Sequence, residues 1–251
     1  VGKSYRDLIR IRRGELGALP DAVVYPGSTE EVAVVLARCV AHKISVIPYG
    51  GGSSVVGGIE ALRGEGHVAA ITLDMTRMDQ VLSIDEVSQT AHIQAGIYGP
   101  ALEAALQAEG YTLGHYPQSY EFSTLGGWIA ARGAGQQSNG YGVASKWLKA
   151  ATVVAPNGEV HTRAYPNSAA GPDLNQLIAG SEGVLGVITD AIVQVHELPS
   201  SRDYRAYFFR DFMQGAGALR EIIQRGISVS MVRLSDAEET TFLSQFSSVG
   251  K

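Results

Sequence analysis

Val46-Ile47-Pro48-Tyr49-Gly50-Gly51-Gly52-Ser53-Ser54-Val55-Val56-Gly57-Gly58 is the stretch that decides the fold. A short apolar run ends at Pro48, and three consecutive glycines follow it. Glycine lets main-chain N–H groups approach an anion without a Cβ in the way, and Ser53 and Ser54 add hydroxyl donors. The stretch therefore predicts a loop that holds phosphate oxygens, with an ordinary glycine-rich turn as the alternative.

This loop is neither of the two best-known phosphate-binding motifs. A Walker loop ends in Gly-Lys-Ser/Thr, but the nearest lysine, Lys43, precedes the strand. A dinucleotide fingerprint needs a third glycine at its sixth position, where this chain has Val55. The loop alone therefore leaves the identity of the anion open.

The elements around the loop predict an α+β fold. Residues 22–25 and 45–48 are expected strands that flank a helix over 30–42, capped by Ser28 or Thr29. This β-α-β order predicts that the two strands are parallel and adjacent. Further strands are expected at 69–73, 81–84, 90–95, 148–155, 160–162 and 184–195, with helices at 99–108, 124–132, 173–179 and 212–224.

Composition excludes several classes of protein. The chain has 251 residues, a formal net charge of −5 and no basic cluster beyond residues 10–13, which argues against nucleic acid as a partner. No apolar run approaches the roughly 18 residues of a membrane helix, and no histidine or cysteine spacing predicts a metal site. Cys39 is the single cysteine, so no disulfide forms within the chain. A cytoplasmic protein is expected, bacterial by its alanine- and glycine-rich composition.

Two later segments share the glycine-rich character of the loop. In residues 117–128, Thr124 is an expected helix cap, and the helix N-terminus would favour a phosphate or a polar ring oxygen, with Arg132 nearby. Residues 180–189 form a glycine-spaced turn that either flanks a flat ligand or packs against another strand. Capping alone remains the alternative for Thr124. A long cofactor such as FAD would explain three such segments in one domain.

Taken in order, these three segments resemble the FAD-binding domain of the vanillyl-alcohol oxidase and p-cresol methylhydroxylase superfamily. Gly114-His115, followed by residues 121–128, 140–142 and 180–183, is most similar to the alkylglycerone-phosphate synthase branch. Glycolate oxidase subunits and D-lactate dehydrogenases share these loops but usually have asparagine where this chain has Trp128.

The resemblance implies a particular domain organisation. Residues 1–20 would be an N-terminal arm, and residues 21–200 would form an FAD-binding domain of the PCMH type. That domain would have two α+β subdomains, at about 21–80 and 81–200. Residues 201–251 would begin a substrate-binding cap domain that is truncated in this chain.

The resemblance also implies site residues around a non-covalently bound FAD. The chain departs from the commoner family pattern at Gln118, where aspartate is frequent, and at Gly133, where alanine is usual. His115 and Arg233 match positions near the flavin and its substrate and are the expected catalytic residues. An ion pair with Asp236 or Glu238 is the alternative role for Arg233. The expected cofactor contacts are Pro48, Tyr49, Gly50, Gly51, Gly52, Ser53, Ser54, Gln118, Ser119, Tyr120, Glu121, Phe122, Ser123, Thr124, Ala131, Arg132, Gly133, Ala134, Glu182, Gly183, Val184, Leu185, Gly186, Val187 and Ile188.

In the synthase branch, a flavin ring nitrogen adds to acyl-dihydroxyacetone phosphate, the fatty acid leaves, and a fatty alcohol replaces it to give an ether lipid precursor. The acid/base tyrosine and the histidine cluster of that branch would follow Lys251, so FAD binding without turnover is expected. An FAD-linked dehydrogenase of D-2-hydroxy acids and an FAD-binding module without activity are the alternatives. A lipid-phosphate substrate leaves contact with a membrane surface open, and a eukaryotic relative would be peroxisomal. The oligomeric state is unknown.

Overall fold

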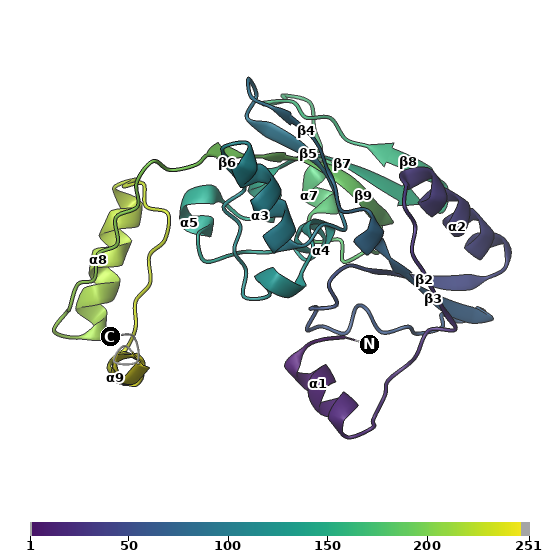
Figure 1. Ribbon diagram of the computed structural model, residues 1–251, viewed down its shortest axis with the longest axis horizontal. Coiled ribbons are helices and arrows are strands. Elements are labelled where there is room, and N and C mark those ends of the chain that lie inside the picture. The colour runs from purple at the N-terminus through teal and green to yellow at the C-terminus, as the bar shows by residue number, and fades with distance from the viewer. Residues whose placement is uncertain (1, 247–251) are drawn as a thin grey trace.

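The glycine loop leaves the edge of a three-stranded parallel sheet in the computed structural model, which describes residues 2–246 (Figure 1). Residues 247–251 of the expected cap domain lie outside this described part of the chain. The strand order is β1-β3-β2, and all three strands run in the same direction. The strands are β1 (Ala22–Val24), β2 (Ile44–Tyr49) and β3 (Ala69–Asp74).

The prediction that the first two strands are adjacent is wrong. They are parallel, but β3 lies between them, and its Ile71 is in register with both Ala22 and Val46. Ala70, Ile71 and Leu73 of β3 are buried, whereas Val23 of β1 is 45% exposed. An almost continuously apolar strand is most stable where it has a neighbouring strand on each side and both of its faces are covered. This explains why β3 is the central strand of the sheet.

Helix α2 (Thr29–Ala41) joins this sheet to the rest of the molecule. As expected, Ser28 caps it, since its hydroxyl accepts a hydrogen bond from the Glu31 N–H at 3.2 Å. Val32 and Leu36 of α2 are buried with Leu73 of β3 and with Val154 and Val187 of a second sheet. One apolar cluster therefore holds the two sheets together.

The second sheet is antiparallel and has the order β4-β5-β9-β7-β8. Its expected strands are confirmed, except that β9 begins at Val187 rather than at Val184, after Gly183 and Gly186 in positive φ. The strands are β4 (Val81–Asp85), β5 (Thr90–Gln94), β7 (Leu148–Ala155), β8 (Gly158–His161) and β9 (Val187–Gln194), and a short pair is formed by β6 (Tyr111–Thr112) and β10 (His196–Glu197).

Short helices line the side of this sheet where the largest core cluster lies. Trp128, Trp147 and Leu102 belong to that cluster, together with Ile93 and Val193 from the sheet. The expected helix over 99–108 is confirmed, and the other helices are brief. They are α3 (Gly99–Ala108), α4 (Leu125–Ala130), α5 (Ser138–Tyr141), α6 (Ala144–Trp147) and α7 (Asn175–Ile178), with the 3-10 turns η1 (Met75–Arg77) and η2 (Tyr120–Phe122).

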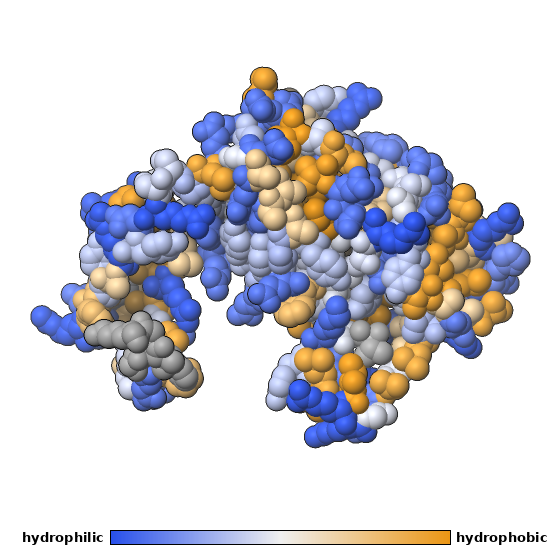
Figure 2. Space-filling view, in the orientation of Figure 1, coloured by the Kyte–Doolittle hydropathy of each residue, from blue (hydrophilic) through white to orange (hydrophobic). Residues whose placement is uncertain are grey.

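The N-terminal helix α1 (Tyr5–Arg12) lies against the glycine loop. The Lys3 N–H donates to the Gly52 carbonyl at 2.7 Å, and Arg10 pairs with Glu60 at 2.6 Å. Figure 2 shows apolar side chains over α1, where Tyr5 and Leu8 are exposed. The polar face of α1 therefore holds the loop, and its apolar face points outward.

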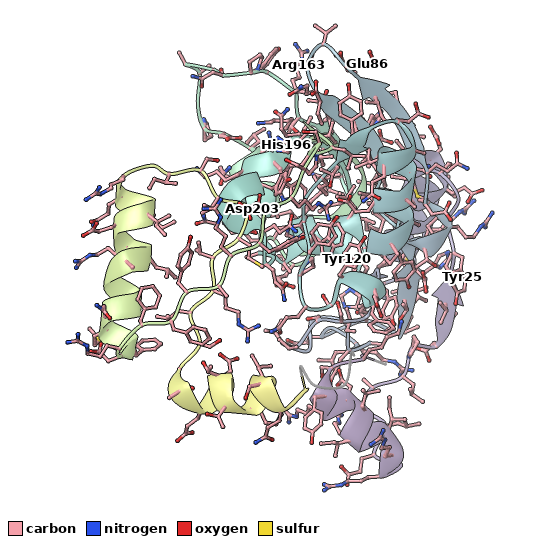
Figure 3. All side chains as sticks on the ribbon, turned by 60° about the vertical axis from the view of Figure 1, so that its left-hand side comes forward. Tyr25, Glu86, Tyr120, Arg163, His196 and Asp203 are labelled. Carbon is pink, nitrogen blue, oxygen red and sulfur yellow. The ribbon has the colours of Figure 1, made fainter. Side chains whose placement is uncertain are left out.

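Residues 201–246 stand apart from both sheets (Figures 1 and 3). Helix α8 (Phe212–Gln224) has the predicted bounds, α9 (Ala237–Phe246) follows it, and Gly215 is the one buried residue of α8. The Asn139 side chain donates to the Val229 carbonyl at 3.1 Å and so ties this segment to the main body. The domain boundaries near residues 80 and 200 stay predictions.

Truncation of Leu73 tests the role of the cluster between the sheets. Leu73 is fully buried, so Leu73→Ala is expected to lower the free energy of unfolding by about 2–5 kcal/mol through lost burial and a cavity. Val23→Ala on the edge strand of the same sheet is the control and should cost less than about 1 kcal/mol. Equal losses in urea unfolding of the two variants would contradict the central position of β3.

Candidate functional site

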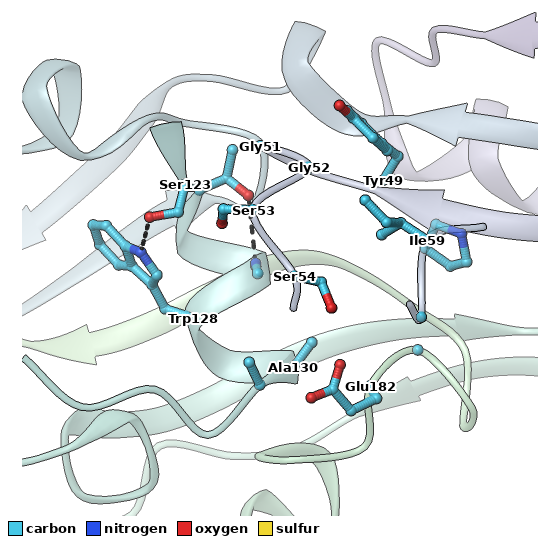
Figure 4. Close-up of a pocket in the computed structure, with 18 of the residues that line it drawn as sticks. Tyr49, Gly51, Gly52, Ser53, Ser54, Ile59, Ser123, Trp128, Ala130 and Glu182 are labelled. Carbon is cyan, nitrogen blue, oxygen red and sulfur yellow. Dashed lines mark hydrogen bonds between the residues drawn. The ribbon is translucent and has the colours of Figure 1, made fainter. Parts of the chain in front are cut away.

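The three glycine-rich segments meet around a cleft of about 410 Å³ (Figure 4). A Cβ at Gly51 would lie 1.8 Å from the Phe122 carbonyl oxygen, and one at Gly50 would lie 2.2 Å from the Thr124 hydroxyl. A Cβ at Gly183 would lie 3.4 Å from the Pro48 side chain. The first segment therefore touches both of the others, and glycine makes its closest contacts sterically feasible.

The cleft offers hydrogen-bond donors but no cation. Among the described residues, no protein acceptor is found for the N–H groups of 51–54, and Ser53 and Ser54 line the cleft with hydroxyls. Glu182, opposite Ser54, is the one carboxylate among the lining residues within 2–246, and none of them is lysine, arginine or histidine. An anion in this cleft would be held by amides and hydroxyls at short range.

The start of helix α4 does not offer the free amides that the sequence suggested. The Leu125 N–H donates to the Ile97 carbonyl at 3.1 Å, and the Gly126 N–H donates to the Ala95 carbonyl at 2.7 Å. The Gly127 N–H donates to the Thr124 hydroxyl at 3.4 Å. Thr124 is therefore a cap and the expected free amides are absent, while contact of Ser123 and Thr124 with a cofactor stays a prediction.

Trp128 is one of the lining residues, but it is only 3% exposed and its indole packs in the core next to the cleft. Its indole N–H donates to the Ser123 hydroxyl at 2.6 Å (Figure 4), and Ser123 in turn donates to the Ser119 carbonyl at 2.7 Å. The ring of Tyr120 stacks on the indole, with centroids 6.4 Å apart and planes 11° from parallel. These contacts set the plane of the indole before any ligand enters.

Arg132 holds the third segment rather than lining the cleft. Its backbone has a φ of 51°, and its guanidinium donates to the Ala179 carbonyl at 2.9 Å and to the Gln176 side chain at 2.7 Å. The Glu182 N–H donates to the Ala130 carbonyl at 3.0 Å, which ties the same turn to the end of α4. Arg132 thereby fixes the turn that carries Glu182 and Gly183.

Most of the expected cofactor contacts line the cleft. They are Pro48, Tyr49, Gly50, Gly51, Gly52, Ser53, Ser54, Ser119, Ser123, Thr124, Ala131, Gly133, Glu182, Gly183, Gly186, Val187 and Ile188. Eight do not line it, and their contact with a cofactor stays a prediction: Gln118, Tyr120, Glu121, Phe122, Arg132, Ala134, Val184 and Leu185.

The sequence reading missed part of the lining. Met75 could have been found, because it follows β3, whose end pairs with the end of β2, and parallel strands end at one edge of a sheet. No local signal marks Ala95, which reaches the cleft through its contact with Gly126. Ile59, Met75, Ala95 and Ala130 lie outside the three predicted segments, whereas Val55, Val56, Gly58, Pro117, Gly126, Gly127 and Trp128 lie within them but were not among the expected contacts.

His115 lies behind the cleft wall. It is 1% exposed, and its ring meets Trp128 and Trp147 edge-on at centroid distances of 4.8 and 5.2 Å. Neither ring nitrogen has a hydrogen-bond partner among the described residues, and burial lowers the pKa of the imidazole to about 4. His115 is therefore neutral at pH 7, and its catalytic role stays a prediction.

Arg233 is not one of the lining residues, and it forms an ion pair. Its partner is Glu239, so the proposed partners Asp236 and Glu238 are both wrong. The side chain of Arg233 is 59% exposed, and an exposed pair of this kind adds little stability. Its catalytic role also stays a prediction.

Comparison with known proteins identifies the family. A family model described as "FAD binding domain" matches residues 20–163, which is more than half of the chain. The chain belongs to this FAD-binding family. It is 41% identical over 239 residues to an alkyldihydroxyacetonephosphate synthase of Dictyostelium discoideum, covering 95% of this chain and 39% of the relative. It is 37% identical over 225 residues to an uncharacterized FAD-linked oxidoreductase of Escherichia coli, covering 89% of this chain and 46% of the relative.

A solved structure of an alkyldihydroxyacetonephosphate synthase is similar to this FAD-binding chain throughout. The TM-score is 0.88 at 40% identity, over 96% of this chain and 43% of the other. The chain thus spans about 40% of the length of these synthases. The resemblance to the synthase branch and the α+β fold are confirmed, and the family implies FAD as the cofactor. No helix within residues 2–246 is long and apolar enough to cross a membrane.

Substitution of Gly51 tests the convergence of the segments. Gly51→Ala would drive a methyl group into the Phe122 carbonyl, so the loop must move and flavin retention should be lost. Gly217→Ala on α8 is the control, because no atom outside its own helix backbone lies within 4 Å of its Cβ and Gly217 does not line the cleft. Purified variants are compared by flavin absorbance per protein. Unchanged flavin content in a folded Gly51→Ala protein would contradict the proposed contact.

The buried imidazole of His115 predicts a pH dependence of stability. The folded-state pKa of about 4 lies below the ordinary value of 6.5, so the unfolded chain takes up the proton first as pH falls. The resulting loss of unfolding free energy between pH 7 and pH 4.5 is about 2 kcal/mol. His115→Phe removes the group and should lack this loss in urea unfolding at both pH values. An equal loss of unfolding free energy in both proteins between these pH values would refute the lowered pKa of His115.

Proposed function

We propose that this chain binds FAD non-covalently in the cleft, with the glycine loop at the pyrophosphate. The observation that carries the proposal is the convergence of three glycine-rich segments, in a member of an FAD-binding family, on a cleft lined by unpaired amides. The residues present fit this cofactor. Residues 51–54 supply amides and hydroxyls for phosphate oxygens, and Ile59, Met75 and Val187 are among the apolar residues of the lining.

The chain's own residues would bind, orient and shield the cofactor. Bound FAD supplies the reactive ring system, which no amino-acid side chain can replace. The Ser123–Trp128 hydrogen bond fixes the indole, and Arg132 fixes the turn that carries Glu182. Tyr49 also lines the cleft, and burial raises the pKa of its hydroxyl above the ordinary value of 10.0.

We infer an alkylglycerone-phosphate synthase-like activity as the leading candidate function. The substrate would be acyl-dihydroxyacetone phosphate, whose acyl group is exchanged for a fatty alcohol with release of the fatty acid. The identity of about 40% to synthases over nearly the whole chain supports this choice. A relative named D-lactate dehydrogenase, from Arabidopsis thaliana and 32% identical over 222 residues, supports oxidation of a small D-2-hydroxy acid as the second candidate.

FAD binding is tested by thermal unfolding with and without the cofactor. A ligand that binds only the folded state at 100 times its Kd stabilises it by about 2.7 kcal/mol, so a clear rise in Tm is expected. FMN lacks the adenosine part and half of the pyrophosphate, so it should stabilise the chain much less. A colourless protein whose Tm does not respond to FAD would defeat the proposal.

The two activities are separated on the FAD-loaded chain with two substrates. Release of fatty acid from acyl-dihydroxyacetone phosphate, with a fatty alcohol present and no net change in the flavin spectrum at the end, supports the synthase. Bleaching of the flavin by D-lactate or glycolate supports the oxidoreductase. FAD binding without either reaction identifies an FAD-binding module that depends on further residues for turnover.

A further inference from the structure

Glu103 is a buried carboxylate that the proposed cleft does not use directly. It lies on α3, is 3% exposed, and has no cationic partner within the described residues. Its oxygens accept hydrogen bonds from the Leu113 and Gly114 N–H groups at 3.0 and 3.1 Å and from the Thr112 hydroxyl at 2.7 Å. Gln107 adds a fourth donor at 3.2 Å.

This arrangement binds one short piece of backbone tightly. Burying a carboxylate is costly unless several donors replace its water, and three of the four donors here belong to residues 112–114. Gly114 has a φ of 69°, and the ring of Tyr141 occupies the space where its Cβ would stand. Residues 112–114 are thus held on one side by the Glu103 carboxylate and on the other by the Tyr141 ring.

The same helix holds the far end of the segment that begins here. The Gly99 N–H at the start of α3 donates to the Ser123 carbonyl at 3.2 Å. A Cβ at Gly99 would lie 2.6 Å from Tyr120, so helix and segment are in close contact there as well. Helix α3 therefore contacts segment 112–123 at both of its ends.

Three residues of this segment, Pro117, Ser119 and Ser123, line the cleft. We propose that Glu103 is a positioning residue for the cofactor site: its carboxylate fixes the start of segment 112–123 and thereby the placement of these three residues against the flavin cofactor. The proposal rests on FAD binding in the cleft. Glu103 itself touches no cleft atom and acts through the backbone of residues 112–114.

Glu103→Gln tests the proposal, because it keeps the shape of the side chain but replaces one acceptor oxygen by an N–H₂ donor that faces other donors. Glu109→Gln is the matched control, since Glu109 is exposed at the C-terminal end of the same helix. FAD affinity is measured by quenching of flavin fluorescence, and the visible circular dichroism of the bound flavin reports the geometry of the site. Far-UV circular dichroism confirms that each protein is folded at the temperature used.

Loss of one charge-assisted anchor is expected to raise the Kd for FAD by about tenfold in Glu103→Gln and to change the flavin dichroism. Glu109→Gln should match the wild type in both. A folded Glu103→Gln protein with wild-type affinity and dichroism would overturn the positioning role and leave the proposed function standing. A wild-type chain that binds no FAD would overturn both.

Hydrogen exchange in the wild type keeps the test decisive if Glu103→Gln does not fold. The amides of Leu113 and Gly114 donate to Glu103, so coupling of this anchor to the site predicts slower exchange at both positions when FAD is bound. The Val87 amide, which donates to the exposed Asp85 in a distant turn, should not respond. Equal exchange rates at residues 113 and 114 with and without FAD would refute the proposal.

Discussion

The contact of Gly51 with the backbone of residues 122–123 is the constraint on which the rest of the structure depends. It brings the parallel sheet against the segment that leads into α4, and no side chain can stand between them. Gly96 makes a second contact of this kind, where a Cβ would lie 1.8 Å from the Met75 carbonyl. Gly51 follows β2, and Met75 follows β3. Both contacts therefore join residues at the end of a strand of the first sheet to residues near the second sheet, and the cleft lies between them.

The described residues that line this cleft include no cationic side chain, so an anion must be held by hydrogen bonds of the right length and direction. Amides and hydroxyls act over the length of a hydrogen bond, whereas lysine and arginine attract phosphate from a distance. The charged and polar groups near this cleft are accordingly used to hold other parts of the protein. Arg132 fixes the turn at 180–186, Ser123 fixes the Trp128 indole, and Arg10 with Glu60 ties α1 to the glycine loop. The donors that line the cleft are backbone amides and hydroxyls, and the side chains behind them hold them in place.

The sequence predicted features that have local causes. Helices α3 and α8 have apolar periodicity and local start or stop signals, and Gly50, Gly51 and Gly183 mark close approaches that glycine permits. Features that depend on residues far away in the sequence were missed or were predicted wrongly. The position of β3 between β1 and β2 is a matter of pairing, and the amides of α4 are taken by carbonyls of residues 95 and 97. No pattern within α4 could reveal that.

The burial of His115 limits the catalytic role that the resemblance assigned to it. A catalytic imidazole needs a proton path, but here both ring nitrogens lie inside a wall formed by Trp128 and Trp147. A Cβ at Gly133 would lie 3.5 Å from Nε2, so the backbone of this cleft residue is what separates the imidazole from the cleft. With a pKa near 4, the ring carries no charge at pH 7 and contributes to the site by supporting the indole. A proton role for His115 would require Trp128 or residue 133 to move, which the Ser123 hydrogen bond to the indole opposes.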